Sequence, residues 1–133
     1  MDSDLRTFST LNNQWIIASQ FVMNYRIGEV PFYHLSLLGG NKIMRGFYEG
    51  RYRGNNLWAI QCELRIPIFK RFFMAPFIST GDVFSFEDYD LVLKWAGGAG
   101  IRYILNREKR VNIRFDIAHG EEFQFYLTVL EAF

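Results

Sequence analysis

The stretch LLGGNKIMRGFYEGRYRGNN, residues 37–56, interrupts a chain that otherwise alternates apolar and polar residues. It combines four arginines or lysines with three aromatic residues and several glycines. Exposed loops rarely hold so many rigid groups, so the stretch is predicted to be a packed, functional loop and not a strand. Gly46 gives backbone freedom next to Arg45, whose guanidinium is expected to seek a carboxylate. From these residues alone, a solvated basic hairpin loop is an equal alternative.

Length and composition restrict the chain to one domain or part of one, since it has 133 residues. Half of the residues are hydrophobic and 18% are aromatic, yet the mean hydropathy is only −0.03. No apolar run approaches the roughly 18 residues of a membrane helix. The net charge of +1 gives no electrostatic basis for binding nucleic acid. The first ten residues do not resemble a signal peptide, and the single Cys62 excludes an internal disulfide.

Apolar residues recur at every second position over most of the chain, which predicts β-strands. Between residues 57 and 66, for example, Ile60, Cys62 and Leu64 alternate with Gln61 and Glu63. No segment of useful length has helical periodicity. The expected strands are residues 14–28, 57–66, 72–80, 91–105, 111–118 and 123–133, and residues 5–10 are compatible with the end of one more. The fold class is therefore all-β, an antiparallel up-and-down meander.

The lengths of strands and connections favour a transmembrane β-barrel over a soluble one. The strands are about ten residues long, and the connections alternate between long and short. Tryptophans and tyrosines lie on the apolar faces near strand ends, where membrane barrels carry aromatic girdles. The polar faces carry charges suited to a wet interior: Arg26, Glu63, Arg65, Arg102, Arg114 and Asp116. Alternation by itself does not tell which face is inside, so a soluble lipid-binding barrel of the lipocalin type remains an alternative.

The number of strands is too small for a closed barrel in lipid. About six strands are expected, whereas the smallest membrane barrels have eight. Unpaired backbone groups at an open edge cost several kcal/mol each in hydrocarbon. Residues 1–133 are therefore expected to be one portion of a larger barrel domain. Several copies completing one barrel is the less favoured alternative.

Several pieces of the sequence, taken in order, resemble one known family. They are LLGGNKIMRGFYEGRYRGNNL, AIQCELRIPIF, FISTGDVF, AGGAGIRY, VNIRFDIAHG and FYLTVLEAF. They are similar to the C-terminal part of the outer-membrane assembly and translocation barrels, the bacterial surface antigen superfamily that includes BamA, TamA and the two-partner secretion transporters. The resemblance covers residues 14–133 and implies about six strands of a barrel of sixteen.

The resemblance implies a loop-lock inside the barrel. In the family, the arginine of an Arg-Gly-Phe motif folds into the lumen and contacts acidic residues on the strand walls. Arg45, Gly46 and Phe47 match this motif, and Glu63 matches the first acidic partner. Many members place an aspartate where this chain has Ser79, so Arg45 is expected to be anchored by Glu63 alone.

The last strand resembles the β-signal that the assembly machinery reads. Phe125, Leu127, Val129 and the terminal Phe133 fit this signal, whereas Glu131 departs from a strictly apolar face. The resemblance implies that this strand pairs with the first strand of the barrel.

No other pattern in the chain predicts a catalytic, cofactor or metal site. His34 and His119 are far apart and lack metal-ligand spacing, and Gly98 to Gly100 lacks the helix of a phosphate loop. The acidic residues Asp82, Glu87, Asp88 and Asp90 are expected to form a solvated loop, with a calcium site as the weaker alternative.

The resemblance implies a non-enzymatic protein of the bacterial outer membrane that inserts or transports proteins. Its expected partners are outer-membrane lipids, the remaining strands of the same barrel and client outer-membrane proteins, with no nucleic acid and no cofactor. Three alternatives stay open at this point: a barrel that anchors or secretes a fused passenger, a porin-like channel, and the lipocalin-like barrel.

Overall fold

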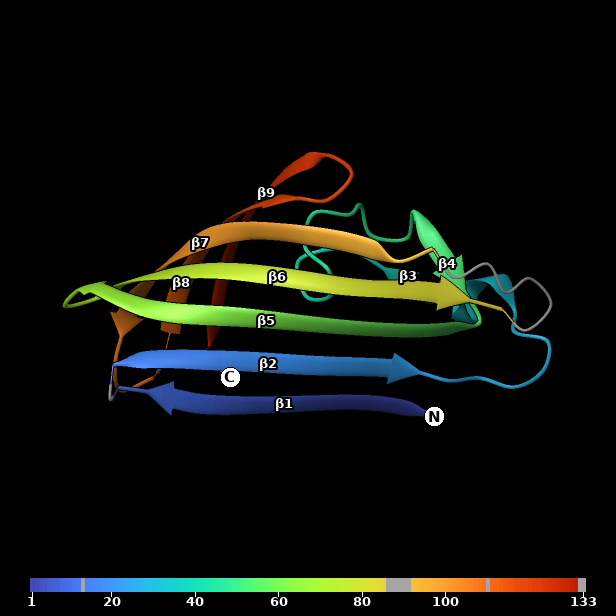
Figure 1. The fold of residues 1–133 in the computed structure, drawn as a ribbon, viewed down its shortest axis with the longest axis horizontal. Coiled ribbons are helices and arrows are strands. Elements are labelled where there is room, and N and C mark those ends of the chain that lie inside the picture. The colour runs from blue at the N-terminus through green and yellow to red at the C-terminus, as the bar shows by residue number, and fades with distance from the viewer. Residues whose placement is uncertain (13, 86–91, 110, 132–133) are drawn as a thin grey trace.

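The computed structural model describes residues 1–12, 14–85, 92–109 and 111–131, with only the backbone of Leu130 and Glu131. A single curved sheet dominates it (Figure 1). Its seven strands, in spatial and in chain order, are β1 (Asp2–Leu11), β2 (Trp15–Asn24), β5 (Asn56–Phe69), β6 (Phe72–Phe84), β7 (Lys94–Asn106), β8 (Val111–His119) and β9 (Phe123–Glu131). Every neighbouring pair is antiparallel. The all-β, up-and-down meander is confirmed, and β1 and β9 form its two edges.

The structure corrects two predictions about the strands. The predicted strand end at residues 5–10 is a full strand, β1, so the sheet has seven strands in the described residues where about six were expected. Its polar composition hid it, because both of its faces are largely exposed. The stretch 37–56 was expected to contain no strand, yet it includes most of β3 (Ser36–Leu38) and all of β4 (Tyr52–Gly54). These two strands pair as a small second sheet that joins the two ends of the loop.

The two faces of the curved sheet differ in chemistry, and the apolar face is the outer one. Residues at alternate strand positions there are 39–75% exposed: Trp15, Ile60, Ile78, Trp95, Ile101, Phe115, Ile117 and Leu127. The opposite, inner face buries charged and polar side chains: Glu63, Ser79, Arg102, Arg114 and Asp116. A lipocalin-type barrel needs the reverse arrangement, with apolar residues inside, so this orientation decides the question that alternation left open.

The segment between β3 and β4 lies inside the curve of the sheet (Figure 1). It follows the short 3-10 helix η1 (Phe32–His34). Met44 and Phe47 from this segment are 0% and 4% exposed, and they pack against the inner face of the strands. The other buried members of this apolar cluster are Val22, Leu38, Leu57, Ala59 and Ala96. The buried apolar cluster therefore fastens the loop to the sheet.

The predicted acidic loop is only partly within the described residues, since Glu87, Asp88 and Asp90 lie outside them. Asp82 was expected in that loop, but it belongs to β6 and is 1% exposed. Its carboxylate accepts hydrogen bonds from Lys94 Nζ at 2.5 Å and from the backbone N–H of Val92 at 3.0 Å. Asp82 is thus an internal anchor for the strand ends and not a solvated loop residue. None of the helices in the described part of the chain has the length and apolar character needed to cross a membrane.

Candidate functional site: a buried loop anchor

A tight turn presents Arg45 to the inner face of the sheet. Met44 and Gly46, on either side of it, both have positive φ, +51° and +110°. The Gly40 N–H donates to the Phe47 carbonyl at 3.0 Å, which closes the base of the turn. A side chain at Gly46 would be strained by this backbone conformation and would meet the Gly120 nitrogen at 2.8 Å. Glycine is therefore required beside the arginine.

Phe47 and Gly46 both contact the hairpin between β8 and β9. The Phe47 ring lies against Gly120, where an added Cβ would come within 2.6 Å of it. The Gly46 N–H donates to the Tyr126 hydroxyl of β9 at 3.1 Å. The Arg-Gly-Phe turn is thus held by the β8–β9 hairpin as well as by the inner face of the sheet.

Arg45 belongs to a closed ring of alternating charges, here called the charge ring and made of Arg45, Glu63, Arg102 and Asp116. Arg45 donates to Glu63 Oε2 at 2.9 Å and to Asp116 Oδ2 at 2.7 Å. Arg102 donates to the same two carboxylates, at 2.7 Å and 2.5 Å respectively. All four residues are no more than 8% exposed. Charge-assisted hydrogen bonds of this kind are shorter and stronger than neutral ones, particularly where water is excluded.

Two features of the neighbouring strands accommodate the charge ring: an aromatic contact with Arg45 and a glycine opposite Asp116. The Arg45 guanidinium lies 3.7 Å from the centroid of the Phe77 ring on β6, a cation–π contact. On β7, Gly100 faces Asp116 across the strand pair, and a Cβ there would lie 1.8 Å from Asp116 Oδ1. A glycine at position 100 of β7 is therefore a space requirement of the charge ring.

Arg65 and Arg114 extend the charge ring on either side. Arg65 Nε donates to Glu63 Oε1 at 3.0 Å. Arg114 Nη2 donates to the Asn41 carbonyl of the loop at 2.8 Å, and its Nε lies 2.8 Å from Asp116 Oδ2. Four arginines thus surround two carboxylates.

The structure brings most of the predicted loop-lock residues together, with one addition and one exception. Arg45 and Glu63 are paired, but the expectation that Glu63 is the sole anchor is wrong because Asp116 is a second, fully buried partner. Ser79 is buried on the inner face, but its hydroxyl donates to the Ala96 carbonyl at 3.4 Å. Asp116 and Arg102 were recognised in the sequence as inward charges. Their contact with Arg45 depends on the register of β7 and β8, which the sequence does not display.

The predicted β-signal residues lie on one face of β9. Phe125, Leu127 and Val129 are 64–75% exposed and continue the outer apolar face. Between them, Tyr126 points inward to the loop, as its bond to Gly46 shows. Phe133 lies outside the described residues.

A second set of contacts joins the rim of the loop to the β8–β9 turn. The Tyr52 hydroxyl donates to Glu121 Oε1 at 2.7 Å, and Arg51 Nε lies 3.1 Å from Glu121 Oε2. The hydrogen bond to this carboxylate, followed by burial, raises the pKa of Tyr52 above its usual value. These contacts are more exposed than the charge ring and are weaker anchors.

No group of three or more histidines, cysteines or acids suited to a metal occurs within the described ranges. The arrangement holds a loop against a sheet, and its buried charges pair with one another.

Comparison with models of protein families finds a match. The model of the Omp85 superfamily domain matches residues 1–128, nearly the whole chain. The chain belongs to the Omp85 superfamily. A search of curated protein sequences finds no significant match.

Membership in the Omp85 superfamily agrees with the resemblance to BamA and TamA seen in the sequence. This superfamily is characteristic of bacterial outer-membrane β-barrels for protein assembly and translocation. The curved, unclosed sheet with its apolar outer face has the form of part of such a barrel.

Proposed function

We propose that this chain is the C-terminal portion of an outer-membrane barrel that inserts or transports proteins, and that its Arg-Gly-Phe loop is a lock inside the lumen. The observation that carries the proposal is the burial of Arg45 between Glu63 and Asp116 on the inner face of an Omp85 sheet. Proteins of the outer membrane are the proposed clients, outer-membrane lipids surround the apolar face, and no bond-making chemistry is involved.

The lock connects three strands of the sheet. Glu63 is on β5, Arg102 on β7 and Asp116 on β8, so one arginine from the loop holds strands that are up to three places apart. Gly46 adds a direct bond to Tyr126 on the edge strand β9. A docked loop would therefore fix the curvature of the sheet near the edge that pairs with the rest of the barrel.

Edge strand β9 is the proposed seam. It pairs with β8 along its whole length and carries the proposed β-signal residues Phe125, Leu127 and Val129; the fourth, Phe133, lies outside the described residues. An unpaired edge cannot stay exposed in hydrocarbon, so β9 and β1 must each pair with further strands in the membrane. We propose that these partners are the remaining strands of the same barrel.

The experiment is insertion of an unfolded outer-membrane barrel into vesicles that contain the full-length protein. The expected result is faster insertion than into empty vesicles, with a loss of most of the gain in Arg45→Ala. Arg51→Ala, in the same loop but about half exposed, is the matched control and should retain activity. Equal insertion rates in empty and protein-containing vesicles would refute the assembly function, and full activity of Arg45→Ala would refute the lock.

A further inference from the structure

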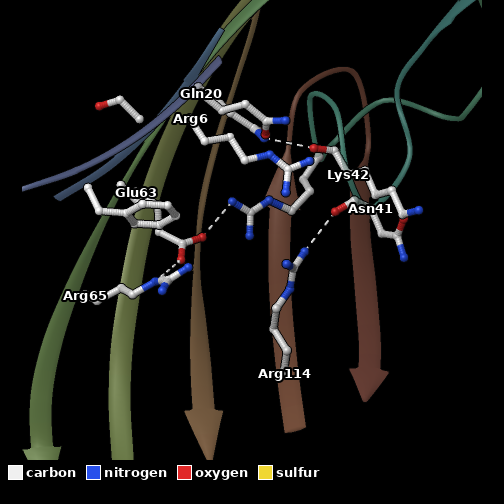
Figure 2. A pocket seen from close by; sticks show the side chains of 12 residues that line it. Arg6, Gln20, Asn41, Lys42, Glu63, Arg65 and Arg114 are labelled. Atoms are coloured by element: carbon white, nitrogen blue, oxygen red, sulfur yellow. Dashed lines mark hydrogen bonds and ion pairs between the residues drawn. The ribbon is translucent and has the colours of Figure 1, made fainter. Parts of the chain in front are cut away.

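A cavity of about 280 Å³ lies beside the charge ring, between the loop and the inner face of the sheet. Figure 2 shows Arg114 reaching from β8 toward Asn41 of the loop, while Arg65 lies beside Glu63. The cavity is far larger than the space required by one water molecule. Its charged lining consists of Arg6, Lys42, Arg45, Arg65, Arg114 and Glu63.

Among the described residues, the cations around this cavity outnumber the carboxylates that reach them. Both oxygens of Glu63 are already engaged, Oε2 by Arg45 and Arg102, and Oε1 by Arg65. Both oxygens of Asp116 are engaged as well. Arg6 is paired with Asp4. Counting Lys42, the described residues place six cations around three carboxylates at this site.

Arg114 has one N–H group that lacks a hydrogen bond in the described part of the chain. The residue is 9% exposed, and its Nε, although 2.8 Å from Asp116 Oδ2, makes no hydrogen bond within the described residues. A buried N–H without a hydrogen bond is costly, since it has lost water and retains only the ionic contact with Asp116. Nε itself is enclosed, but Arg114 lines the cavity, so an anion placed there would lie beside its guanidinium.

We propose that this cavity binds a small oxyanion of the phosphate or sulfate type. Guanidinium groups present paired N–H donors that match the oxygens of such anions. The anion would supply the missing negative charge beside Arg114. Lys42 and the Asn41 backbone place the loop at one wall of the cavity, whereas Arg114 belongs to β8. The bound anion therefore bridges loop and sheet and strengthens the docking of the loop.

This inference goes beyond the proposed transport function, because binding of a small anion can be measured without any client protein. A barrel that inserts clients normally but ignores phosphate would contradict only the inference. A barrel that binds phosphate but inserts nothing would contradict only the proposed function.

The test is isothermal titration of the full-length protein in detergent with sodium phosphate and sodium sulfate, against sodium chloride at matched ionic strength. Saturable binding of phosphate or sulfate is expected, and both should raise the unfolding midpoint more than chloride does. Arg114→Gln should weaken binding by more than about tenfold, because a charge-assisted bond is lost. Lys42→Gln should weaken it several-fold, and Lys109→Gln, on an exposed turn, should leave it unchanged.

Lys42→Gln keeps the test decisive if Arg114→Gln does not fold, because the Lys42 side chain is exposed and lies outside the charge ring. Phosphate binding no tighter than chloride binding in the unmodified protein would overturn the proposal. This result is expected if a carboxylate from elsewhere in the barrel already fills the cavity. Unchanged affinity in both Lys42→Gln and folded Arg114→Gln would overturn it equally.

Discussion

Replacing Arg45 with alanine tests the reasoning about the loop most directly. The substitution removes two hydrogen bonds, to Glu63 and Asp116, and the cation–π contact with Phe77. Both carboxylates remain buried, with Arg102 still bound to each of them. The loop keeps its apolar contacts through Met44, so the expected result is a loosened loop in a folded sheet.

The magnitude follows from the burial of the pair. Breaking a buried ion pair by removing one partner costs about 3–5 kcal/mol, and Arg102 reduces that cost by keeping the carboxylates partly compensated. A loss of about 3 kcal/mol from docking lowers the ratio of docked to undocked loop by more than about a hundredfold. An exposed pair such as Arg51 with Glu121 contributes only about 0–1 kcal/mol.

Hydrogen–deuterium exchange of the full-length protein in detergent measures this ratio. Amides of residues 39–50 should exchange more than about a hundredfold faster in Arg45→Ala, while those of β5 to β8 keep their protection. Arg51→Ala should change exchange of the same amides by less than about tenfold. Equal protection of the loop in Arg45→Ala and the unmodified protein would show that the apolar cluster alone holds the loop, and the charge ring would lose its proposed role.

Three further predictions concern the sheet and the loop rim. Gly100→Ala should destabilise the folded barrel by about 1–3 kcal/mol or more in urea unfolding, because its Cβ would overlap the Asp116 carboxylate. Ile78→Arg should cost about 2–4 kcal/mol in lipid vesicles if the outer apolar face meets the bilayer near its midplane. The pKa of Tyr52 is raised in the folded protein, so its hydrogen bond to Glu121 stabilises the loop rim fully at pH values below the ordinary tyrosine pKa. This stabilisation is lost as pH rises through the raised pKa. Spectroscopic titration of the unmodified protein, compared with Tyr52→Phe, measures the raised pKa of this tyrosine.

Each of these predictions has a control within the chain. Gly97→Ala should be tolerated in packing terms, since its Cβ would have only an ordinary 3.6 Å contact. Phe69→Arg lies next to the β5–β6 turn and should cost only about 0–1 kcal/mol. Tyr33→Phe, at a residue that is 81% exposed, should leave the high-pH transition unchanged. Equal effects of the test and control substitutions would contradict the corresponding assignment.

The sequence by itself determined the all-β class, most of the strand order and the identity of the Arg-Gly-Phe loop. Alternation of period two is a local property, because successive side chains on an extended backbone point to opposite faces. This alternation correctly predicted the apolar and polar faces of β5 and β8. It predicted only the end of β1, at residues 5–10, because both sides of this strand are largely exposed and carry no such contrast.

Only the tertiary structure decided which face is inside and which charges meet Arg45. Glu63 and Asp116 are far apart in the chain, and they share one arginine because the registers of β5 to β8 bring them to the same depth. Register and curvature arise from pairing between strands, so no single stretch of sequence contains them. Because of the same strand pairing, the Ser79 hydroxyl donates a hydrogen bond to the Ala96 carbonyl, and Asp116 is the second residue that anchors Arg45.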